Sequence, residues 1–125
     1  MSKEIRVAMS IEAEKGNLVI PPYTMDKDID MNGSVGGVPG LVAIATTAGG
    51  TAVDLSALTT LGWILMTNLD SSNNVNWGPY VSGSLHLIGR IKPGESALFR
   101  LYPGSVLRMI AETANVKVQI IAFDD

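Results

Sequence analysis

Two aromatic residues beside a run of asparagines are the side chains of this sequence best suited to bind a ligand. Trp77 and Tyr80 flank Gly78-Pro79, and three asparagines precede them: Asn73, Asn74 and Asn76. A Gly-Pro pair typically interrupts a strand, so we expect the two rings to lie in an exposed loop. Exposed rings beside amides suit a sugar-binding platform, but they also anchor protein interfaces. We interpret Trp77 and Tyr80 as interface residues, with a sugar site as the alternative, and Trp63 as a core residue.

An acidic segment near residue 30 resembles the start of a calcium-binding loop. Residues 28–33 read Asp-Ile-Asp-Met-Asn-Gly, with oxygen ligands at alternate positions before a glycine. The twelfth position, which should supply a bidentate glutamate, is Pro39, and no helix signals flank the segment. We therefore predict no metal site and no cofactor. Asp26, Asp28 and Asp30 are expected on the solvent face of a strand whose other face carries Ile29 and Met31.

The single histidine, His86, has no catalytic setting in the sequence. A general base needs a nucleophile in reach and a group that orients it, and Ser84-Leu85-His86 matches no such motif. Gly-x-Ser-x-Gly, Walker and His-Glu-x-x-His motifs are all missing from the sequence. A convergent pair of carboxylates cannot be recognised from sequence alone. We predict that the protein is not an enzyme and that His86 is a partly exposed strand residue.

Other polar residues are explained by turn chemistry. Asn68 and Asp70 precede Val75 and can bond neighbouring backbone amides, which would build the turn between two strands. Glu95 follows Pro93-Gly94 and is expected to be solvated or structural.

The elements that must hold these residues are short strands. Apolar residues alternate with polar ones over residues 5–14, Lys15-Gly16-Asn17 predicts a hairpin turn, and residues 18–20 form the returning strand, which Pro21-Pro22 should end. The alternation predicts one face on a core and one in water. Residues 33–40, rich in glycine, are expected to form a mobile loop or a docking arm.

The middle of the chain continues the pattern. Residues 41–47 and 51–55 predict two strands joined through Ala48-Gly49-Gly50, and residues 56–60 predict a connector with at most one helical turn. The apolar run 61–66 suits a central strand covered on both faces.

The last two predicted strands, residues 106–112 and 116–123, end on an unusual pattern. Val116, Val118, Ile120 and Ala122 share one face of the final strand, whereas the other face changes from Lys117 and Gln119 to Ile121 and Phe123. Ile121 and Phe123 should therefore be buried or meet another subunit. We predict a homo-oligomer, a dimer or a trimer.

Composition narrows the class of protein. The 125 residues fit one domain over 1–125, and the absence of cysteine excludes disulfides. A net charge of −3 with no basic cluster argues against a nucleic-acid partner, and no apolar run is long enough for a membrane helix. The N-terminus lacks the apolar stretch of a signal peptide, so we expect synthesis and retention in the cytoplasm until assembly. With 46% hydrophobic and 17% charged residues, some apolar surface is expected to meet a partner.

Some eight to ten short strands with regular turns, and no amphipathic helix, predict an all-β chain folded as an antiparallel β-sandwich. The order of three sequence motifs resembles that of a known protein family. Residues 62–75 read Gly-Trp-x4-Asn-Leu-Asp-x2-Asn-x-Val, followed by Ile-Lys-Pro-Gly-Glu at 91–95 and Ala-Leu-Phe-Arg-Leu at 97–101. This resembles the capsid decoration, or cement, proteins of tailed bacteriophages over residues 53–125.

The resemblance implies a jelly-roll-like sandwich that is a non-enzymatic virion component. Its partner would be the major capsid protein, and it would bind and stabilise the assembled capsid shell. Our interpretation of Trp77 and Tyr80 as interface residues places these two among the expected contacts. Two alternatives stay open. One is a phage tail or head-fibre module that binds host glycan through Trp77 and Tyr80, and the other is a carbohydrate-binding module or enzyme unrelated to phage.

Overall fold

The computed structural model describes residues 5–31 and 33–125, and every regular element in these ranges is a β-strand. The strands are β1 (Ile5–Lys15), β2 (Leu18–Ile29), β3 (Gly36–Ile44), β4 (Thr51–Ala52), β5 (Leu61–Asn68), β6 (Val75–Val81), β7 (Ser84–Leu85), β8 (Gly89–Ile91), β9 (Ser96–Arg100), β10 (Leu107–Ala111) and β11 (Val116–Asp124). The chain, expected to form one domain, divides into two compact units, Met1–Asn32 and Gly33–Asp125.

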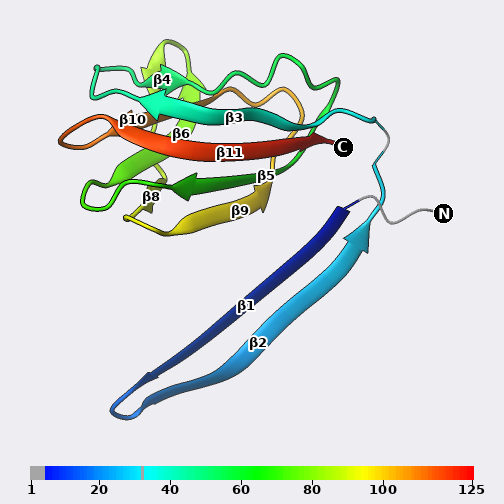
Figure 1. The fold of residues 1–125 in the computed structure, drawn as a ribbon, viewed down its shortest axis with the longest axis vertical. Coiled ribbons are helices and arrows are strands. Elements are labelled where there is room, and N and C mark those ends of the chain that lie inside the picture. The colour runs from blue at the N-terminus through cyan, green and yellow to red at the C-terminus, as the bar shows by residue number, and fades with distance from the viewer. Residues whose placement is uncertain (1–4, 32) are drawn as a thin grey trace. The chain divides into compact units, whose positions relative to one another are not determined.

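The first unit is the predicted hairpin, which we call the arm. β1 and β2 pair antiparallel from Ile5 opposite Ile29 to Lys15 opposite Leu18, so Gly16 and Asn17 form the turn (Figure 1). Gly16 takes a φ of +57°, a conformation that glycine adopts without strain. The arm is a two-stranded ribbon, with no third strand paired to it among the described residues.

The predicted end of the second strand was wrong. β2 continues through Pro21-Pro22 to Ile29. The register shifts at this point, where Ile11 pairs with Tyr23 but Ala13 pairs with Ile20, so two prolines face the single residue Glu12. Such a β-bulge leaves ladder positions unpaired, and prolines, which lack an N–H donor, are tolerated there.

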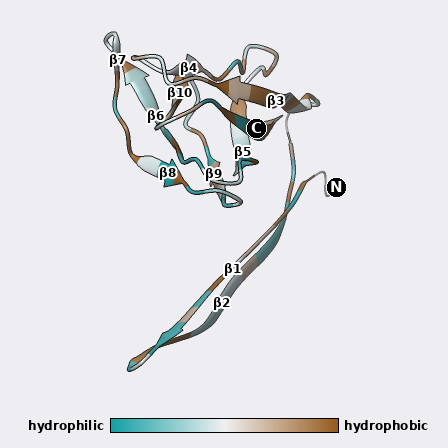
Figure 2. Ribbon diagram, turned by 60° about the vertical axis from the view of Figure 1, so that its left-hand side comes forward, coloured by the Kyte–Doolittle hydropathy of each residue, from teal (hydrophilic) through white to brown (hydrophobic). Residues whose placement is uncertain are grey.

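The alternating residues of β1 form a strand as predicted, but the apolar face of this strand is buried only in part. Ile5 and Val7 are buried, whereas Ile11 is 69% exposed and its cross-strand partner Tyr23 is 76% exposed. Figure 2 shows apolar and polar segments mixed along the whole arm. Within this unit, the apolar face of the arm is therefore largely uncovered.

The second unit is an antiparallel β-sandwich, as predicted. One sheet has the order β3-β11-β5-β9, and the other has the order β4-β10-β6, with β7 and β8 pairing successive parts of β6 (Figure 1). Consecutive strands mostly alternate between the sheets, and the late strands β10 and β11 insert between early ones. This is the strand order of a jelly roll, which the family resemblance implied.

The glycine-rich segment 33–40 was wrongly expected to be a loop. β3 begins at Gly36 and pairs with β11 up to Val116 opposite Ile44. A Cβ at Gly36 would meet the ring of Phe123, and one at Gly33 would overlap the carboxylate of Asp124. These glycines allow the strand to approach β11 closely, and loop flexibility is not their role here.

The next two strands do not pair with each other, although the sequence suggested a hairpin. β3 ends at Ile44 and lies beside β11, whereas the two-residue β4 lies beside β10 in the other sheet. The Ala48-Gly49-Gly50 turn therefore carries the chain between sheets. Residues 56–60 contain only a turn, closed by the Leu58 amide donating to the Leu55 carbonyl at 3.1 Å.

The core lies between the two sheets. β5 occupies an interior position of its sheet, between β11 and β9, as predicted, but only every second residue is buried, so the expected cover on both faces was wrong. Residues 107–111 and 116–124 form the predicted last two strands. Large side chains that are almost completely buried come from both sheets: Ile44, Ile64, Met66, Val118 and Ile120 from the first, and Val75, Ile91 and Met109 from the second.

Candidate interaction surfaces

Trp77 lies in a strand, and the prediction of a loop at Gly78-Pro79 was wrong. Both residues belong to β6, and Pro79 pairs with Leu107 of β10. The Trp77 indole is half-buried and stacks on the ring of Phe99 from the other sheet, with 4.7 Å between ring centroids and 10° between planes. Offset stacking of this kind holds both rings rigidly.

Two glycines explain how β6 accommodates this arrangement. A Cβ at Gly89 would overlap the Trp77 indole, and a Cβ at Gly78 would overlap the carbonyl oxygen of His86. The backbone of β8 therefore lies directly against the indole, and the segment after β7 lies directly against β6. The Gly-Pro pair is a packing requirement within the strand.

Trp77 lies at the base of an apolar groove of about 370 Å³, which we call the Trp77 groove. Its rim carries Ile88, Tyr102 and Val106, of which Ile88 is 70% and Tyr102 82% exposed. Sequence reasoning found Trp77 but missed the rim. The only signal for Tyr102 is its place beside the turn residues Pro103-Gly104, where an aromatic side chain is easily left in solvent.

Tyr80 does not lie beside Trp77. The two residues are three positions apart in β6, so their side chains occupy opposite faces of the sheet. The guanidinium carbon of Arg108 lies 3.6 Å from the Tyr80 ring centroid. This cation-π contact covers a face of the ring, so Trp77 and Tyr80 do not form one aromatic platform.

Ile121 and Phe123 lie on the outer face of the sheet β3-β11-β5-β9. Val116, Val118, Ile120 and Ala122 are buried on the inner face, as the alternation predicted. The cross-strand register places Ile121 in one row with Pro39, Leu65 and Leu98, and all four are partly exposed. We call this row, with the adjacent Trp63 and Phe123, the outer sheet face.

Trp63 was wrongly interpreted as a core residue. It alternates with the buried Gly62 and Ile64, which places it on the outer sheet face. The Arg100 guanidinium lies 5.4 Å from its ring centroid, and Arg100 also forms a 2.6 Å ion pair with Asp125. Because Trp63 lies on an apolar run, sequence alone did not reveal which side chains of that run face outward.

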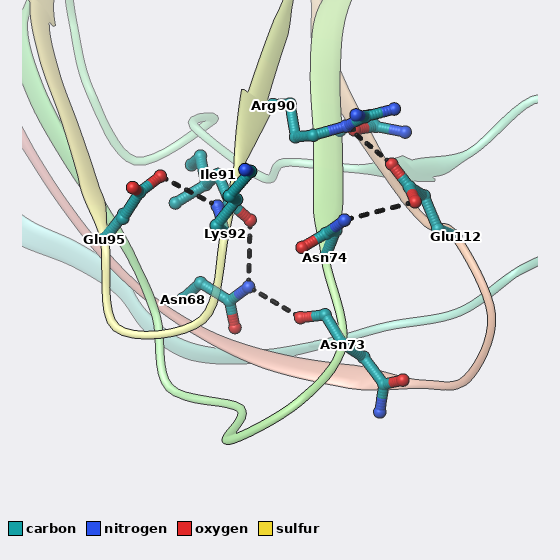
Figure 3. Close-up of polar contacts among 9 residues, drawn as sticks. Asn68, Asn73, Asn74, Arg90, Ile91, Lys92, Glu95 and Glu112 are labelled. Atoms are coloured by element: carbon teal, nitrogen blue, oxygen red, sulfur yellow. Dashed lines mark hydrogen bonds and ion pairs between the residues drawn. The ribbon is translucent and has the colours of Figure 1, made fainter.

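The turn residues behave as predicted. Asn68 donates from Nδ2 to the Asn73 and Ile91 carbonyls at 2.9 and 3.0 Å (Figure 3), and its Oδ1 accepts from the Asp70 amide. The Asp70 carboxylate accepts the amide protons of Ser72 and Asn73, and these bonds lower its pKa. Glu95 accepts from the Lys92 amide at 3.1 Å.

A second polar cluster joins the strands of the other sheet (Figure 3). Glu112 accepts a hydrogen bond from Asn74 and forms a 2.7 Å ion pair with Arg90. The hydrogen bond from Asn74 is the largest cause of the lowered pKa of Glu112. These contacts tie the end of β10 to β6 and β8, which is a structural role.

The acidic run belongs to the arm. Asp26 forms an ion pair with Arg6, whose Nη2 lies 2.6 Å from its Oδ2, and the hydrogen bond from Arg6 lowers the pKa of Asp26. Asp28 pairs with Arg6 across the ladder, so Asp26 and Asp28 share the polar face, whereas half-buried Ile29 lies on the opposite one. Asn32 of the calcium-loop pattern lies outside the described residues.

Chemistry-bearing clusters are sparse in the described ranges. Within residues 5–31 and 33–125, no three His, Cys, Asp or Glu side chains gather as metal ligands do. His86 was wrongly expected to be a partly exposed strand residue: it is exposed and lies just after the end of β7. The same ranges contain no helix long and apolar enough to cross a bilayer.

Comparison with known proteins gives no relative: no family model, no curated protein and no solved structure matches this chain.

Proposed function

We propose that this protein is a non-enzymatic virion structural protein that decorates an assembled phage capsid and stabilises its shell. The motif order over residues 62–101 resembles that of capsid decoration proteins, and a jelly-roll sandwich is the fold which that resemblance implied. The partner is the major capsid protein, and the location is the outside of the capsid.

The Trp77 groove is the observation that supports this proposal most directly. Its base is the rigid Trp77–Phe99 stack, and its rim holds the exposed Ile88, Tyr102 and Val106. Large apolar side chains around a preformed hollow are the usual anchors of a protein interface, because they bury much area with little loss of side-chain entropy. A small module that presents them can bind a repeated shell at many equivalent sites.

Such binding would stabilise the shell by mass action. A protein that binds the assembled shell and not its dissociated subunits contributes RT ln(1 + [L]/Kd) per site, about 2.7 kcal/mol at a hundredfold excess over Kd. The gain accumulates over the many sites of a capsid.

The test is rebinding of the purified protein to capsids of the encoding phage prepared without it. We expect saturable binding and a raised temperature of capsid disruption. Tyr102→Ala should weaken binding about tenfold to thirtyfold, because a rim anchor contributes roughly 1.4–2 kcal/mol. Tyr102 is a better probe than Trp77, whose truncation would also remove the stack on Phe99.

Leu87→Ala is the matched control, because Leu87 is an exposed apolar residue next to Ile88 that does not line the groove. It should bind within about twofold of the parent. Equal binding by the parent and Tyr102→Ala would exclude the groove as the docking surface. No binding of the parent to capsids would reject the decoration function.

The glycan-binding alternative finds less support in the geometry. It needs Trp77 and Tyr80 on one surface, whereas they lie on opposite faces of β6 and Arg108 covers a face of Tyr80. Specific retention of the purified protein on a glycan array would nevertheless favour it over the capsid proposal.

A further inference from the structure

The arm has an apolar surface that its own unit leaves uncovered. On one face of the ribbon, Met9 pairs with Met25 and Ile11 with Tyr23, and we call these four residues the apolar stripe. The other face carries Arg6, Asp26, Ser10 and Thr24. A two-stranded ribbon is at best marginally stable in water by itself, so an apolar stripe of this length requires a cover.

The sandwich has an apolar surface of a matching kind. The row Pro39, Ile121, Leu65 and Leu98 crosses all four strands of the sheet, with Trp63 and Phe123 beside it. Sheets commonly pack face to face through such rows, at a separation of about 10 Å. The outer sheet face therefore suits a flat, apolar β-ribbon as its partner.

We propose that two copies of this chain form a dimer by exchanging arms, with the apolar stripe of each copy packed on the outer sheet face of the other. Each chain carries one donor and one acceptor surface. Two copies related by a two-fold axis can thus satisfy both at once, as isologous dimers do.

The area of contact favours two exchanged arms over one. At about 3.4 Å per residue, the 11 residues of β1 extend about 37 Å, and two strands are about 10 Å wide, so the whole side of the arm that carries the apolar stripe has a footprint of at most about 370 Å². One arm on one sheet buries at most about 740 Å² in total, less than stable interfaces do. Two such contacts bury at most about 1,480 Å², which reaches the usual range of about 1,200–2,000 Å².

The proposed dimer uses the arm and the outer sheet face, and neither surface includes the exposed groove residues Ile88, Tyr102 and Val106 on which capsid binding is proposed to rest, although Arg100 borders both the groove and Trp63. Failure of dimerisation and failure of capsid binding can accordingly be measured separately.

The absence of native cysteine allows a direct crosslinking test on the full chain. One preparation carries Ile11→Cys on the apolar stripe, and the other, with a short tag that changes its mass, carries Leu65→Cys on the outer sheet face. After mixing and treatment with a short bis-maleimide, we expect a covalent dimer that contains one chain of each kind.

Ser10→Cys is the matched control, because Ser10 neighbours Ile11 but lies on the polar face of the arm. Its mixture with Leu65→Cys should give at least tenfold less mixed dimer. Equal crosslinking of the two mixtures would overturn the proposal. So would a double variant, Ile11→Cys with Leu65→Cys, that crosslinks only within one chain, since the arm would then cover its own sandwich.

Sedimentation equilibrium supplies a second measurement without crosslinks. Tyr23→Lys places a charge in the apolar stripe and should raise the dimer dissociation constant at least tenfold, whereas Thr24→Lys, on the polar face, should change it less than threefold. Tyr23 is 76% exposed, so its substitution leaves the fold of the monomer intact. A parent that remains monomeric at micromolar concentrations would refute the exchange.

Discussion

Asn68 shows how one polar side chain can organise a turn from inside the protein. It ends β5, is 0% exposed, and uses both its amide nitrogen and its oxygen in hydrogen bonds. The nitrogen joins the turn at Asn73 to β8 at Ile91, which lies 23 positions after Asn68 in the sequence. A buried amide that makes all its hydrogen bonds is stabilising, but removal of the amide leaves its buried partner groups without a hydrogen bond.

We expect Asn68→Ala to lower the free energy of unfolding by about 3 kcal/mol, because the buried Ile91 carbonyl loses a donor and a small void is left. Chemical denaturation followed by tryptophan fluorescence measures this change. Asn73→Ala is the control: it keeps the backbone carbonyl that Asn68 uses and removes the side-chain contacts of Asn73 with Thr113 and Asp70. A cost for Asn68→Ala no larger than that of Asn73→Ala would contradict the role given to the amide.

At the scale of elements, Asp124 joins three segments at the end of β11. Its carboxylate accepts the Val35 amide at 3.0 Å and the Thr59 amide at 2.8 Å, and its own amide donates to the Val35 carbonyl. Asp124 is 2% exposed. The hydrogen bond from Val35 is the largest cause that lowers the pKa of Asp124, and burial opposes it.

This lowered pKa predicts a dependence of stability on pH. A carboxylate whose pKa is lower in the folded state than in the unfolded state stabilises the fold above its unfolded pKa, near 3.8, and that stabilisation is lost as pH falls through the folded pKa. The melting temperature of the parent should therefore exceed that of Asp124→Asn at pH 6, and the gap should narrow as the pH is lowered from about 5 to about 2.

Asp125→Asn provides the comparison, because it removes a neighbouring carboxylate whose partner is the partly exposed Arg100. Such pairs contribute little, so its melting temperature should stay close to that of the parent throughout. If the difference in melting temperature between the parent and Asp124→Asn stayed constant with pH, the charge of the Asp124 carboxylate would not be what stabilises the contacts at the end of β11.

At the scale of the whole molecule, the chain consists of a sandwich with its own core and an arm without one. Like the whole chain, the arm carries a net negative charge. Its ion pair between Arg6 and Asp26 is exposed, so this pair contributes little stability. If arms are exchanged between copies, the stability of the protein depends on its concentration.

We expect the melting temperature to rise by about 2–5 °C for a tenfold increase in protein concentration, as mass action requires of a folded dimer of this chain length. Differential scanning calorimetry at two concentrations measures the shift. Tyr23→Lys should reduce the shift and Thr24→Lys should preserve it. An identical melting temperature at both concentrations for the parent would argue against a dimer.

The sequence by itself determined most of the strands and the faces of several, since alternation is a local property. Residues 5–13 and 116–122 show this: an apolar residue stands at every second position, and these positions share one face of the strand. The turn roles of Asn68, Asp70 and Glu95 were also predictable, because each side chain bonds backbone groups within a few residues.

Only the tertiary structure decided where breaker residues are tolerated and how deeply each aromatic lies. Pro21-Pro22, Gly36 and Gly78 lie within strands because the partner across each one provides a bulge or a close approach, and neither is visible in the local sequence. The depths of Trp63 and Trp77 depend on Arg100 and Phe99, which reach them only after distant strands pair. Local periodicity specifies a strand, whereas strand partners, and the surfaces they leave uncovered, follow from non-local packing.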